Sequence, residues 1–250
     1  MNTENITEAA RIVRAAQQIV ALTGAGFSTP SGIPDFRGDG GLWLQEDPMA
    51  VASLSGFRNN PQRFFRWFQP LLDTLLSAQP NPAHLALNDL EHAGKMRAVI
   101  TQNIDGLHQR AGSREVYELH GHVRSATCIV CHRQIPSDAL LKHARRGEAM
   151  RCSCGGMFKP NVVLFEEELP QGLYWLAMHA LEQCDVVLVA GTALEVFPVS
   201  SLPLIALERG ARLVIVNKSS THLDERADVV LRGDVAEILP AITATMADNQ

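Results

Sequence analysis

The stretch GAGFSTPSGIPDFRG at residues 24–38 decides how the chain folds, and the apolar run QIVALT (18–23) leads directly into it. A buried strand that ends in a Gly-x-Gly turn is typical of a dinucleotide-binding sheet. The third glycine of the G-x-G-x-x-G fingerprint is absent, because Thr29 stands in its place. Pro30 and Pro34 oppose the helix that would normally follow. The stretch therefore predicts a phosphate-binding loop with no long helix behind it.

The residue types of this loop suit an anion. Gly24 and Gly26 let the backbone approach a phosphate closely, and free N–H groups with the hydroxyls of Ser28 and Thr29 can hold it. Arg37 adds a positive charge. The lost third glycine argues against an ordinary Rossmann dehydrogenase. So does the absence of a second strand that ends in an acidic residue about 20 positions later.

Composition limits the class of protein. The 250 residues are enough for one domain with a full core, or for one domain that carries a small inserted module. The net charge of -5 gives no general electrostatic attraction to nucleic acid or to anionic membranes, so neither is expected as a partner. No apolar run approaches the ~20 residues of a membrane span, and the N-terminus lacks the features of a signal peptide. We expect a cytoplasmic protein, whose oligomeric state the sequence does not predict.

Short apolar runs alternate with segments of helical spacing along most of the chain. The runs are QIVALT (18–23), RAVIT (97–101), DVVLVA (185–190) and RLVIV (212–216), with DVVL (228–231) as a candidate fifth. The helical segments are roughly 6–17, 61–77, 82–93, 173–183 and 200–209. Because each run is apolar on both faces, helices should cover the sheet on both sides. The alternation predicts an α/β fold with a Rossmann-like, doubly wound parallel sheet, built from residues 1–121 and 161–250.

Four of these runs lead into polar or glycine-rich clusters, which read GAGFS, QNIDG, GTALE and NKSS. Each cluster alone fits an ordinary turn at the end of a strand. In an open parallel sheet, however, the carboxyl ends of the strands line the ligand crevice. We therefore expect the four clusters to converge on one site, to which TQNIDGLH (101–108) brings amides and a carboxylate and LHGH (119–122) brings an imidazole.

Two segments break the alternation. Residues 122–160 lack a long apolar strand and hold four of the five cysteines, so we interpret them as a small inserted module. Residues 34–60 are rich in Gly, Pro, Asn and Asp and are predicted to form a long flexible loop.

The cysteines of the inserted module are spaced as metal ligands. Cys128, Cys131, Cys152 and Cys154 form a C-x2-C-x20-C-x-C pattern. Two such pairs can close a tetrahedral zinc site of four thiolates, although one residue rather than two separates the second pair. His132 and His143 are spare donors that could replace one thiol, and buried structural thiols or a redox pair would also fit the pattern. A closed four-ligand site leaves no position for substrate, so the zinc would be structural.

Together these features resemble the sirtuin family of NAD-dependent protein deacylases, from about residue 8 to residue 239. The matching stretches are GAGFSTPSGIPDFRG, TQNIDGLH, ELHG (118–121), the four-cysteine module, KPNVVLFEE (159–167), GTALEVFP (191–198) and IVN (215–217). Agreement of seven motifs in chain order makes the resemblance specific. It also implies that the loop at 34–60 binds the cofactor.

The resemblance implies an NAD-dependent protein-lysine deacetylase. Acetyl-lysine and NAD would yield lysine, nicotinamide and 2′-O-acetyl-ADP-ribose, with NAD consumed as a co-substrate and zinc as a structural metal. As nicotinamide leaves, the acyl oxygen attacks the sugar carbon, and water completes the release of lysine. His120 matches the family's general base, which takes a proton from a ribose hydroxyl. Histidine suits this step because its pKa lies near neutral pH.

Other roles are also implied residue by residue. Asn103 and Asp105 should position the ribose, an ordered water and the nicotinamide carboxamide, and Phe36 should shield the reacting carbon. The further positions assigned to NAD are Gly24, Ala25, Gly26, Ser28, Thr29, Arg37, Gln102, Ile104, Gly191, Thr192, Ala193, Asn217, Lys218, Asp234 and Val235. The positions assigned to the acetylated peptide are Val163, Phe165, Glu166, Glu167 and Val196. The peptide should pair as a strand between residues 165–167 and 195–197.

The chain departs from the family pattern in ways that bear on the substrate. Glu166 replaces the usual glycine of Phe-Gly-Glu, which could add a preference for basic peptides, and Ala193 replaces the usual serine of Gly-Thr-Ser. Family members that remove succinyl or malonyl groups carry a Tyr and an Arg three residues apart, whereas RFFRWFQPLL (63–72) has no Tyr. We therefore expect acetyl-lysine as the substrate, with longer neutral acyl chains as a second possibility. Mono-ADP-ribosyl transfer would use the same activated sugar, and a non-catalytic NAD-binding or zinc-ribbon protein would carry some of the same motifs.

Overall fold

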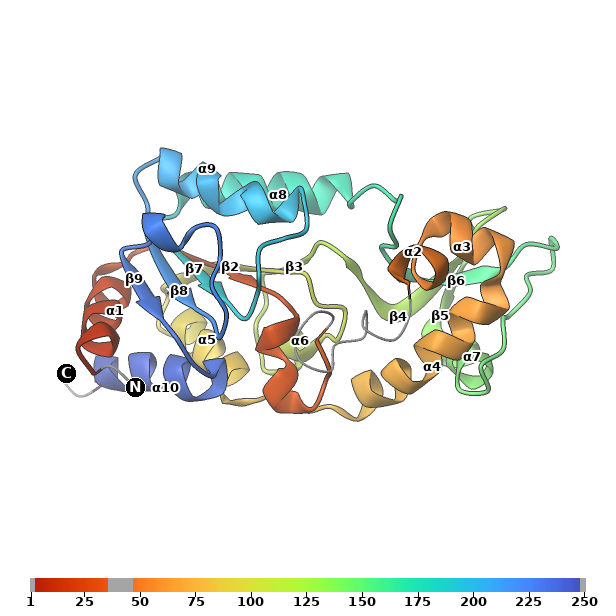
Figure 1. Cartoon of the computed structure of the whole chain (residues 1–250), viewed down its shortest axis with the longest axis horizontal. Helices are drawn as coiled ribbons and strands as arrows, with labels where there is room; N and C mark the ends of the chain where they lie inside the picture. Colours follow the sequence, from red (N-terminus) through yellow and green to blue (C-terminus); the bar gives the residue numbers. More distant parts are fainter. Residues whose placement is uncertain (1–2, 36–46, 248–250) are drawn as a thin grey trace.

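The computed structural model of the chain describes residues 3–35 and 47–247, and Figure 1 shows two units side by side. The larger unit contains α1 (Thr3–Ala15), β1 (Ile19–Thr23), α5 (Pro82–His92), β2 (Met96–Thr101), α6 (Leu107–Arg110), β3 (Val116–Glu118), α8 (Gln171–Gln183), β7 (Val186–Ala190), α9 (Leu202–Glu208), β8 (Arg212–Val216), β9 (Val229–Leu231) and α10 (Val235–Ala247). The smaller unit contains α2 (Pro48–Val51), α3 (Leu54–Asn59), α4 (Pro61–Ser77), β4 (Gly121–Cys128), β5 (Gln134–Pro136), α7 (Ser137–Ala144) and β6 (Phe158–Val162).

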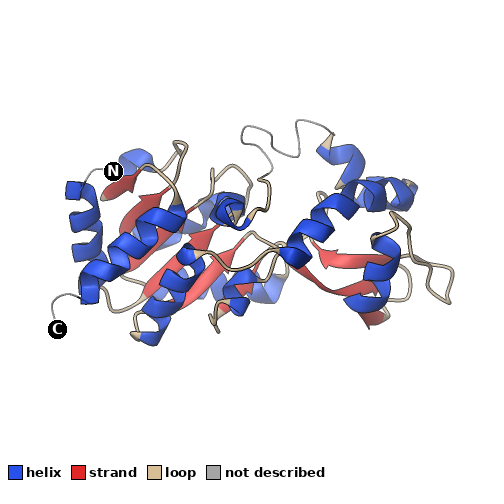
Figure 2. Ribbon diagram, turned by 90° about the horizontal axis from the view of Figure 1, so that it is seen from below, coloured by secondary structure: helices blue, strands red, loops and turns tan. Residues whose placement is uncertain are grey.

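The larger unit is a six-stranded parallel sheet in the order β3-β2-β1-β7-β8-β9. Every residue of β1 and β7 is buried, because helices cover both faces of the sheet. In Figure 2 helices lie on both sides of these strands. The predicted doubly wound sheet is therefore confirmed, and so are the five predicted runs. The edge strand β3 was not predicted, because only three residues of the chain form it.

Alternate residues of the strands belong to two hydrophobic clusters on opposite faces. Ile19 and Ala21 face α1, α5 and α10, whereas Val20 and Leu22 face α8 and α9. This period of two is the geometry of a β-strand with both faces buried. Helices therefore pack on both faces of the sheet and bury its apolar side chains, as the sequence predicted.

The smaller unit is organised around an antiparallel sheet in the order β5-β4-β6. Its hydrophobic cluster is larger than the segment 122–160 alone would provide, because α3 and α4 contribute aromatic side chains to it. Phe57, Phe64 and Phe65 are fully buried there, with ring centroids 5.2 to 6.0 Å apart. Helix α4 was predicted at these residues, but the sequence pattern did not show that it packs against the inserted module.

The described part of the predicted loop 34–60 contains the two short helices α2 and α3. The side chain of Asp47 accepts a hydrogen bond from Met49 N (3.0 Å), and Ser53 Oγ accepts one from Gly56 N (2.9 Å). Asp and Ser are frequent in loops because their side chains bond to the nearby backbone, and the same property makes them helix N-caps. Residues 48–51 and 54–59 of the predicted loop are therefore helical, while the flexibility of the segment and its part in cofactor binding stay predictions. No helix in the described ranges has the length and hydrophobicity that crossing a membrane requires.

The glycines of two strand ends allow the turns after β1 and β7 to pack directly on one another. Gly191 has φ +63°, and a Cβ atom there would lie 2.2 Å from the backbone nitrogen of Phe27. A Cβ atom on Gly26 would lie 3.0 Å from the carbonyl oxygen of Gly191, and one on Gly24 would lie 2.7 Å from Thr192 Cβ. These glycines are thus required by the contact between two neighbouring turns, in addition to any phosphate that they hold.

We predict that Gly191→Ala destabilises the protein more than Gly210→Ala does. Both glycines have positive φ, but no atom lies within 4 Å of the position that a Cβ on Gly210 would take. Gly210→Ala should lower the free energy of unfolding by about 1–2 kcal/mol, the cost of a left-handed alanine. Gly191→Ala should add a further ~1–3 kcal/mol of steric strain. Urea denaturation measures both, and equal losses would contradict the close packing of the two turns.

Candidate active site

A cavity of about 1430 Å³ opens at the carboxyl end of the parallel sheet. Both units line it: the turns after β1, β2, β7 and β8 on one side, and α4 and the segment after β6 on the other. The predicted convergence of the four strand ends is therefore confirmed.

Most of the predicted site residues line this cavity. They are Ala25, Gly26, Ser28, Thr29, Gln102, Asn103, Ile104, Asp105, His120, Val163, Phe165, Glu166, Glu167, Gly191, Thr192, Ala193, Val196, Asn217, Lys218 and Val235. Gly24 and Asp234 lie beside it but do not line it. Phe36 and Arg37 fall outside the described residues.

The turn after β1 contains two short 3-10 helices, η1 (Ala25–Phe27) and η2 (Thr29–Ser31), in place of a long helix. Its side chains bond to the turn after β2. Ser28 Oγ donates to Asp105 Oδ2 (2.7 Å), and Asn103 Nδ2 donates to the carbonyl oxygen of Gly24 (3.0 Å) and to Ser28 Oγ (3.1 Å). Ser28, Asn103 and Asp105 are all buried, so the network holds them in one arrangement.

Asp105 has a raised pKa. The main cause is burial, which disfavours the charged carboxylate, and the negative charge of Glu118 acts in the same direction. Hydrogen bonds from the backbone N–H of Leu107 (2.8 Å) and from the hydroxyl of Ser28 oppose the shift. Asp105 is thus a buried, oriented acceptor at the base of the cavity.

The imidazole of His120 is oriented by the backbone of a neighbouring strand end. His120 Nδ1 lies 3.1 Å from the carbonyl oxygen of Gln102. Because a carbonyl can only accept, Nδ1 carries the proton and the basic lone pair resides on Nε2. The side chain of Gln102 is held in turn, since its Nε2 donates to Thr192 Oγ1 (2.9 Å).

Two other histidines near the turn after β1 are enclosed in the core. His84 and His108 are buried against Phe27, and the centroids of their rings lie 4.8 Å apart. Burial lowers the pKa of His84 to about 3, and burial together with His84 lowers the pKa of His108. Neither lines the cavity, whereas His120 does. Of these three histidines, His120 alone is placed to exchange a proton with a bound molecule.

The far end of the cavity follows β8. Asn217 is buried, and its Nδ2 donates to the carbonyl oxygen of Ser219 (3.0 Å). Lys218 forms an ion pair with Asp234 (2.9 Å), which also accepts a hydrogen bond from Ala236 N (2.9 Å) at the start of α10. Asp234 therefore positions the Lys218 side chain from beside the cavity.

The segment after β6 is anchored to the catalytic histidine candidate. Val163 N donates to the carbonyl oxygen of His120 (2.8 Å). Glu167 accepts hydrogen bonds from Leu164 N (2.8 Å) and from the buried ammonium group of Lys159 (2.8 Å). The carboxylate of Glu167 thus stabilises this segment, and its charge is balanced by Lys159.

The wall of the cavity that α4 provides is apolar. Phe64, Trp67, Phe68, Leu71 and Leu75 line it, with the rings of Phe64 and Phe68 stacked at 5.2 Å. Arg63 and Arg66 are exposed and do not line the cavity.

The sequence did not identify one further wall, formed by α8. Gln171, Tyr174, Trp175 and Met178 line the cavity, and their spacing places them on one face of the helix. Trp175 is 60% exposed, and Phe197 in the turn after β7 is 79% exposed. The apolar run Leu173–Leu176 was the sequence signal that could have predicted this wall. Four successive apolar residues are more than the one face of α8 that covers the sheet can bury, so some of them must face elsewhere.

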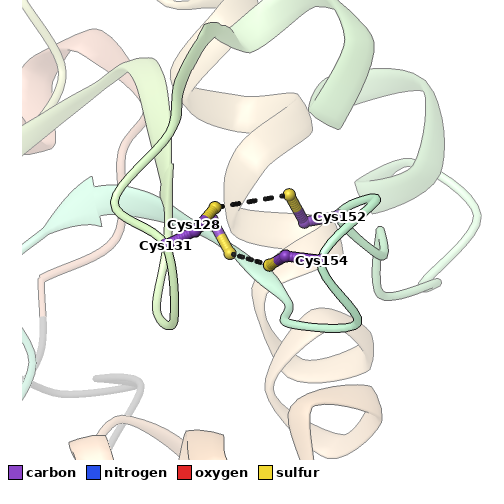
Figure 3. A group of neighbouring side chains, drawn as sticks. All are labelled: Cys128, Cys131, Cys152 and Cys154. Atoms are coloured by element: carbon purple, nitrogen blue, oxygen red, sulfur yellow. Dashed lines mark hydrogen bonds between the residues drawn. The ribbon is translucent and has the colours of Figure 1, made fainter.

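The four cysteines of the smaller unit face one another, as Figure 3 shows. Cys128 Sγ lies 3.5 Å from Cys154 Sγ, Cys131 Sγ lies 3.7 Å from Cys152 Sγ, and all four sulfurs lie within 4.8 Å. Four zinc–sulfur bonds of 2.3 Å in a tetrahedron place the sulfurs about 3.8 Å apart. The four thiols therefore fit structural zinc, without a histidine ligand.

The backbone of the two knuckles favours thiolates. An N–H group of Cys131 lowers the pKa of Cys128, and an N–H group of Cys154 lowers the pKa of Cys152 to about 6. An N–H group of Gly156 also lowers the pKa of Cys154, but the neighbouring thiols of Cys131 and Cys128 outweigh it and raise that pKa to about 11, so these two thiols share the negative charge unequally with Cys154 before metal binds. Deprotonated sulfur is the form that binds zinc.

We predict that Cys152→Ala removes zinc and unfolds the smaller unit at a lower temperature. The free energy of unfolding should fall by about 3 kcal/mol or more, because binding of a structural zinc contributes directly to folding. Elemental analysis and thermal denaturation provide the measurement. The control is Cys184→Ala, since Cys184 is buried in the larger unit away from the cluster and the variant should keep its zinc. A zinc-free protein of unchanged stability would contradict the structural role.

The fold and the site together define a class of enzyme that binds a dinucleotide and contains zinc. The sheet is Rossmann-like, its crevice holds the catalytic-histidine candidate, and the four-thiol site lies apart from it. The chain belongs to the Sir2 family, whose model matches residues 24–198. It is 45% identical to the NAD-dependent protein deacylase 2 of Archaeoglobus fulgidus, over 96% of this chain and 95% of that protein. It is also 45% identical to the NAD-dependent protein deacetylase 1 of Pyrobaculum aerophilum, over 96% and 94% of the two chains.

Solved structures agree with this assignment. One from a study of the mechanism and regulation of Sir2 enzymes has a TM-score of 0.93 and 44% identity, covering 97% of this chain and 98% of that one. A Sir2 variant with a deacetylated p53 peptide and 3′-O-acetyl ADP-ribose has a TM-score of 0.91 and 37% identity, over 96% and 98%. A Sir2 protein bound to a myristoylated histone peptide has a TM-score of 0.84 and 39% identity, over 98% and 97%.

Proposed function

We propose that this protein is an NAD-dependent protein-lysine deacetylase, which converts acetyl-lysine, NAD and water to lysine, nicotinamide and 2′-O-acetyl-ADP-ribose. The observation that carries the proposal is the orientation of His120 within the cavity. Its basic Nε2 shares the cavity with the buried Ser28–Asn103–Asp105 network and with the segment after β6. Bound NAD supplies an electrophilic ribose carbon and a good leaving group, which are what an unreactive amide requires.

His120 acts as the general base on a ribose hydroxyl. The carbonyl of Gln102 holds the proton on Nδ1, so Nε2 is the nitrogen that accepts the second proton. Hydrogen bonding to that carbonyl also stabilises the imidazolium that forms. Asn103 and Asp105 orient the nicotinamide ribose and carboxamide, because their own hydrogen bonds to the turn after β1 fix them in place.

The glycine-rich turns hold the pyrophosphate, and the β8 end holds the adenosine. Gly26 and Gly191 bring two backbone turns together at the cavity. Thr29, Gln102 and Thr192 add hydrogen-bonding groups, and Asn217 and Lys218 lie at the far end. The acetylated protein segment adds as a strand between residues 165–167 and 195–197, with Val163 and Phe165 lining the path of the acyl-lysine side chain.

We also propose a cytoplasmic location. The cysteines of the described residues are all free thiols, and four of them are arranged for metal rather than disulfides. Such a site suits a reducing compartment.

A second candidate activity is the removal of longer neutral acyl chains. The apolar wall of α4 favours it, and a relative of 39% identity has been solved with a myristoylated peptide. The same wall disfavours acyl chains that end in a carboxylate.

We predict that His120→Ala lowers the deacetylation rate by about 10²–10⁴-fold, the usual contribution of a general base. NAD affinity should change little, because the Ser28–Asn103–Asp105 network is retained. The rate on an acetylated peptide and the Kd of NAD are the measurements. His122→Ala is the matched control, since His122 is two residues away and does not line the cavity. Activity of the His120 variant within about threefold of wild type would remove His120 from this role.

We predict that acetyl-lysine is hydrolysed far faster than succinyl-lysine. A succinyl carboxylate would enter a space bordered by Trp67, Phe68 and Leu71, where an unpaired charge is costly. Arg63 and Arg66, the nearby cations on α4, are exposed and are not among the residues that line the cavity. The kcat/KM values on matched acetyl and succinyl peptides decide the matter. A succinyl value equal to or above the acetyl value would overturn the prediction.

A further inference from the structure

Glu166 adopts a backbone conformation that glutamate rarely takes. Its φ is +71°, and within residues 3–35 and 47–247 only His132 and Leu194 are other non-glycine residues with positive φ. A side chain in the left-handed region costs roughly 1–2 kcal/mol, so local contacts must hold it there.

The contacts that hold Glu166 come from α3. Glu166 Oε2 accepts a hydrogen bond from Ser55 N (2.8 Å), and Oε1 accepts one from Ser55 Oγ (3.0 Å). Both carboxylate oxygens are therefore engaged by one residue in the first turn of α3. Hydrogen bonds to an ionised acceptor are stronger than those between neutral groups.

The backbone around these two residues is joined as well. Phe165 N donates to the carbonyl oxygen of Ala52 (2.9 Å), and Leu54 N donates to the carbonyl oxygen of Phe165 (3.0 Å). Ser53 and Phe165 thus form a parallel bridge. Four hydrogen bonds join residues 52–55 to residues 165–166, and we call this junction the Glu166 clamp.

The Glu166 clamp completes the support of the segment that borders the cavity. At its start, Val163 N bonds to the carbonyl oxygen of His120. At its end, the clamp ties it to α3, and the two anchored residues, Val163 and Phe165, line the cavity. Besides the clamp, the contact of Val163 to His120 and the hydrogen bonds of Glu167 to Lys159 and to Leu164 N also hold this segment.

We propose that Glu166 is a positioning residue that prepares residues 163–166 to receive the acylated peptide. Pre-ordering of this segment lowers the entropy lost when a peptide pairs with it, so the clamp acts on peptide binding rather than on NAD. The clamp also occupies the carboxylate, which opposes the expectation that Glu166 attracts basic peptides directly. The proposal rests on the proposed deacetylase function.

The test compares three substitutions at one position. Glu166→Asn tolerates positive φ but is too short to reach Ser55, and Glu166→Gly also removes the two side-chain hydrogen bonds of the clamp while relieving the backbone. Glu166→Gln keeps the reach, and its carbonyl oxygen can still accept from Ser55 N. Ser55→Ala removes only the hydroxyl donor.

We expect the Asn and Gly variants to raise the KM for an acetylated peptide by roughly threefold to tenfold. Their KM for NAD should stay within about twofold of wild type. Glu166→Gln should raise the peptide KM less than the Asn and Gly variants do, because its carbonyl oxygen still accepts from Ser55 N. Ser55→Ala should have an intermediate peptide KM. An unchanged peptide KM in Glu166→Gly, or an equal rise in both KM values, overturns the proposal.

Amide hydrogen exchange separates this proposal from the proposed function. In the protein without substrates, the amides of Leu54 and Phe165 should exchange faster in the Asn and Gly variants than in wild type and Glu166→Gln. If wild type fails to deacylate any acyl-lysine peptide with NAD, the proposed function fails, while the exchange rates still report on the clamp. Unchanged exchange in all variants overturns the clamp itself.

Discussion

The contact between the turns after β1 and β7 is the constraint on which the site depends. Two neighbouring parallel strands end together, and their backbones then approach so closely that a Cβ atom on Gly191 would overlap the backbone of Phe27. Only glycine permits this approach with the observed φ. Because the first turn is held there, Ser28 reaches Asp105 and Gly24 reaches Asn103.

A series of hydrogen bonds connects these two turns to the segment after β6, on the substrate side of the cavity. Thr192 Oγ1 in the second turn accepts a hydrogen bond from the side-chain amide of Gln102, and the backbone carbonyl of Gln102 accepts one from His120 Nδ1. The backbone carbonyl of His120 then accepts a hydrogen bond from Val163 N. The orientation of the imidazole and the position of the peptide-binding segment therefore depend on the same series of hydrogen bonds, which are short and directional.

Some of the fold could be predicted because a local cause produced it. The five runs became strands since each is apolar on both faces, and the cysteine spacing predicted a cluster whose sulfur distances fit zinc. Other features could not be predicted from local pattern. Residues 48–59 contain the residue types of a loop but form capped helices, and α4 packs on the inserted module although it lies between two strands of the larger sheet in the chain.

The sequence by itself determined the class of fold, the four-thiol site and the convergence of polar strand ends, because periodicity, spacing and chain order are properties of the chain. Only the tertiary structure decided which nitrogen of His120 is basic and that α8 contributes a wall with Trp175. It also decided that Glu166 binds Ser55, 111 residues away in the chain. The direction of a side chain depends on partners from distant segments, and no local pattern specifies those partners before the chain has folded.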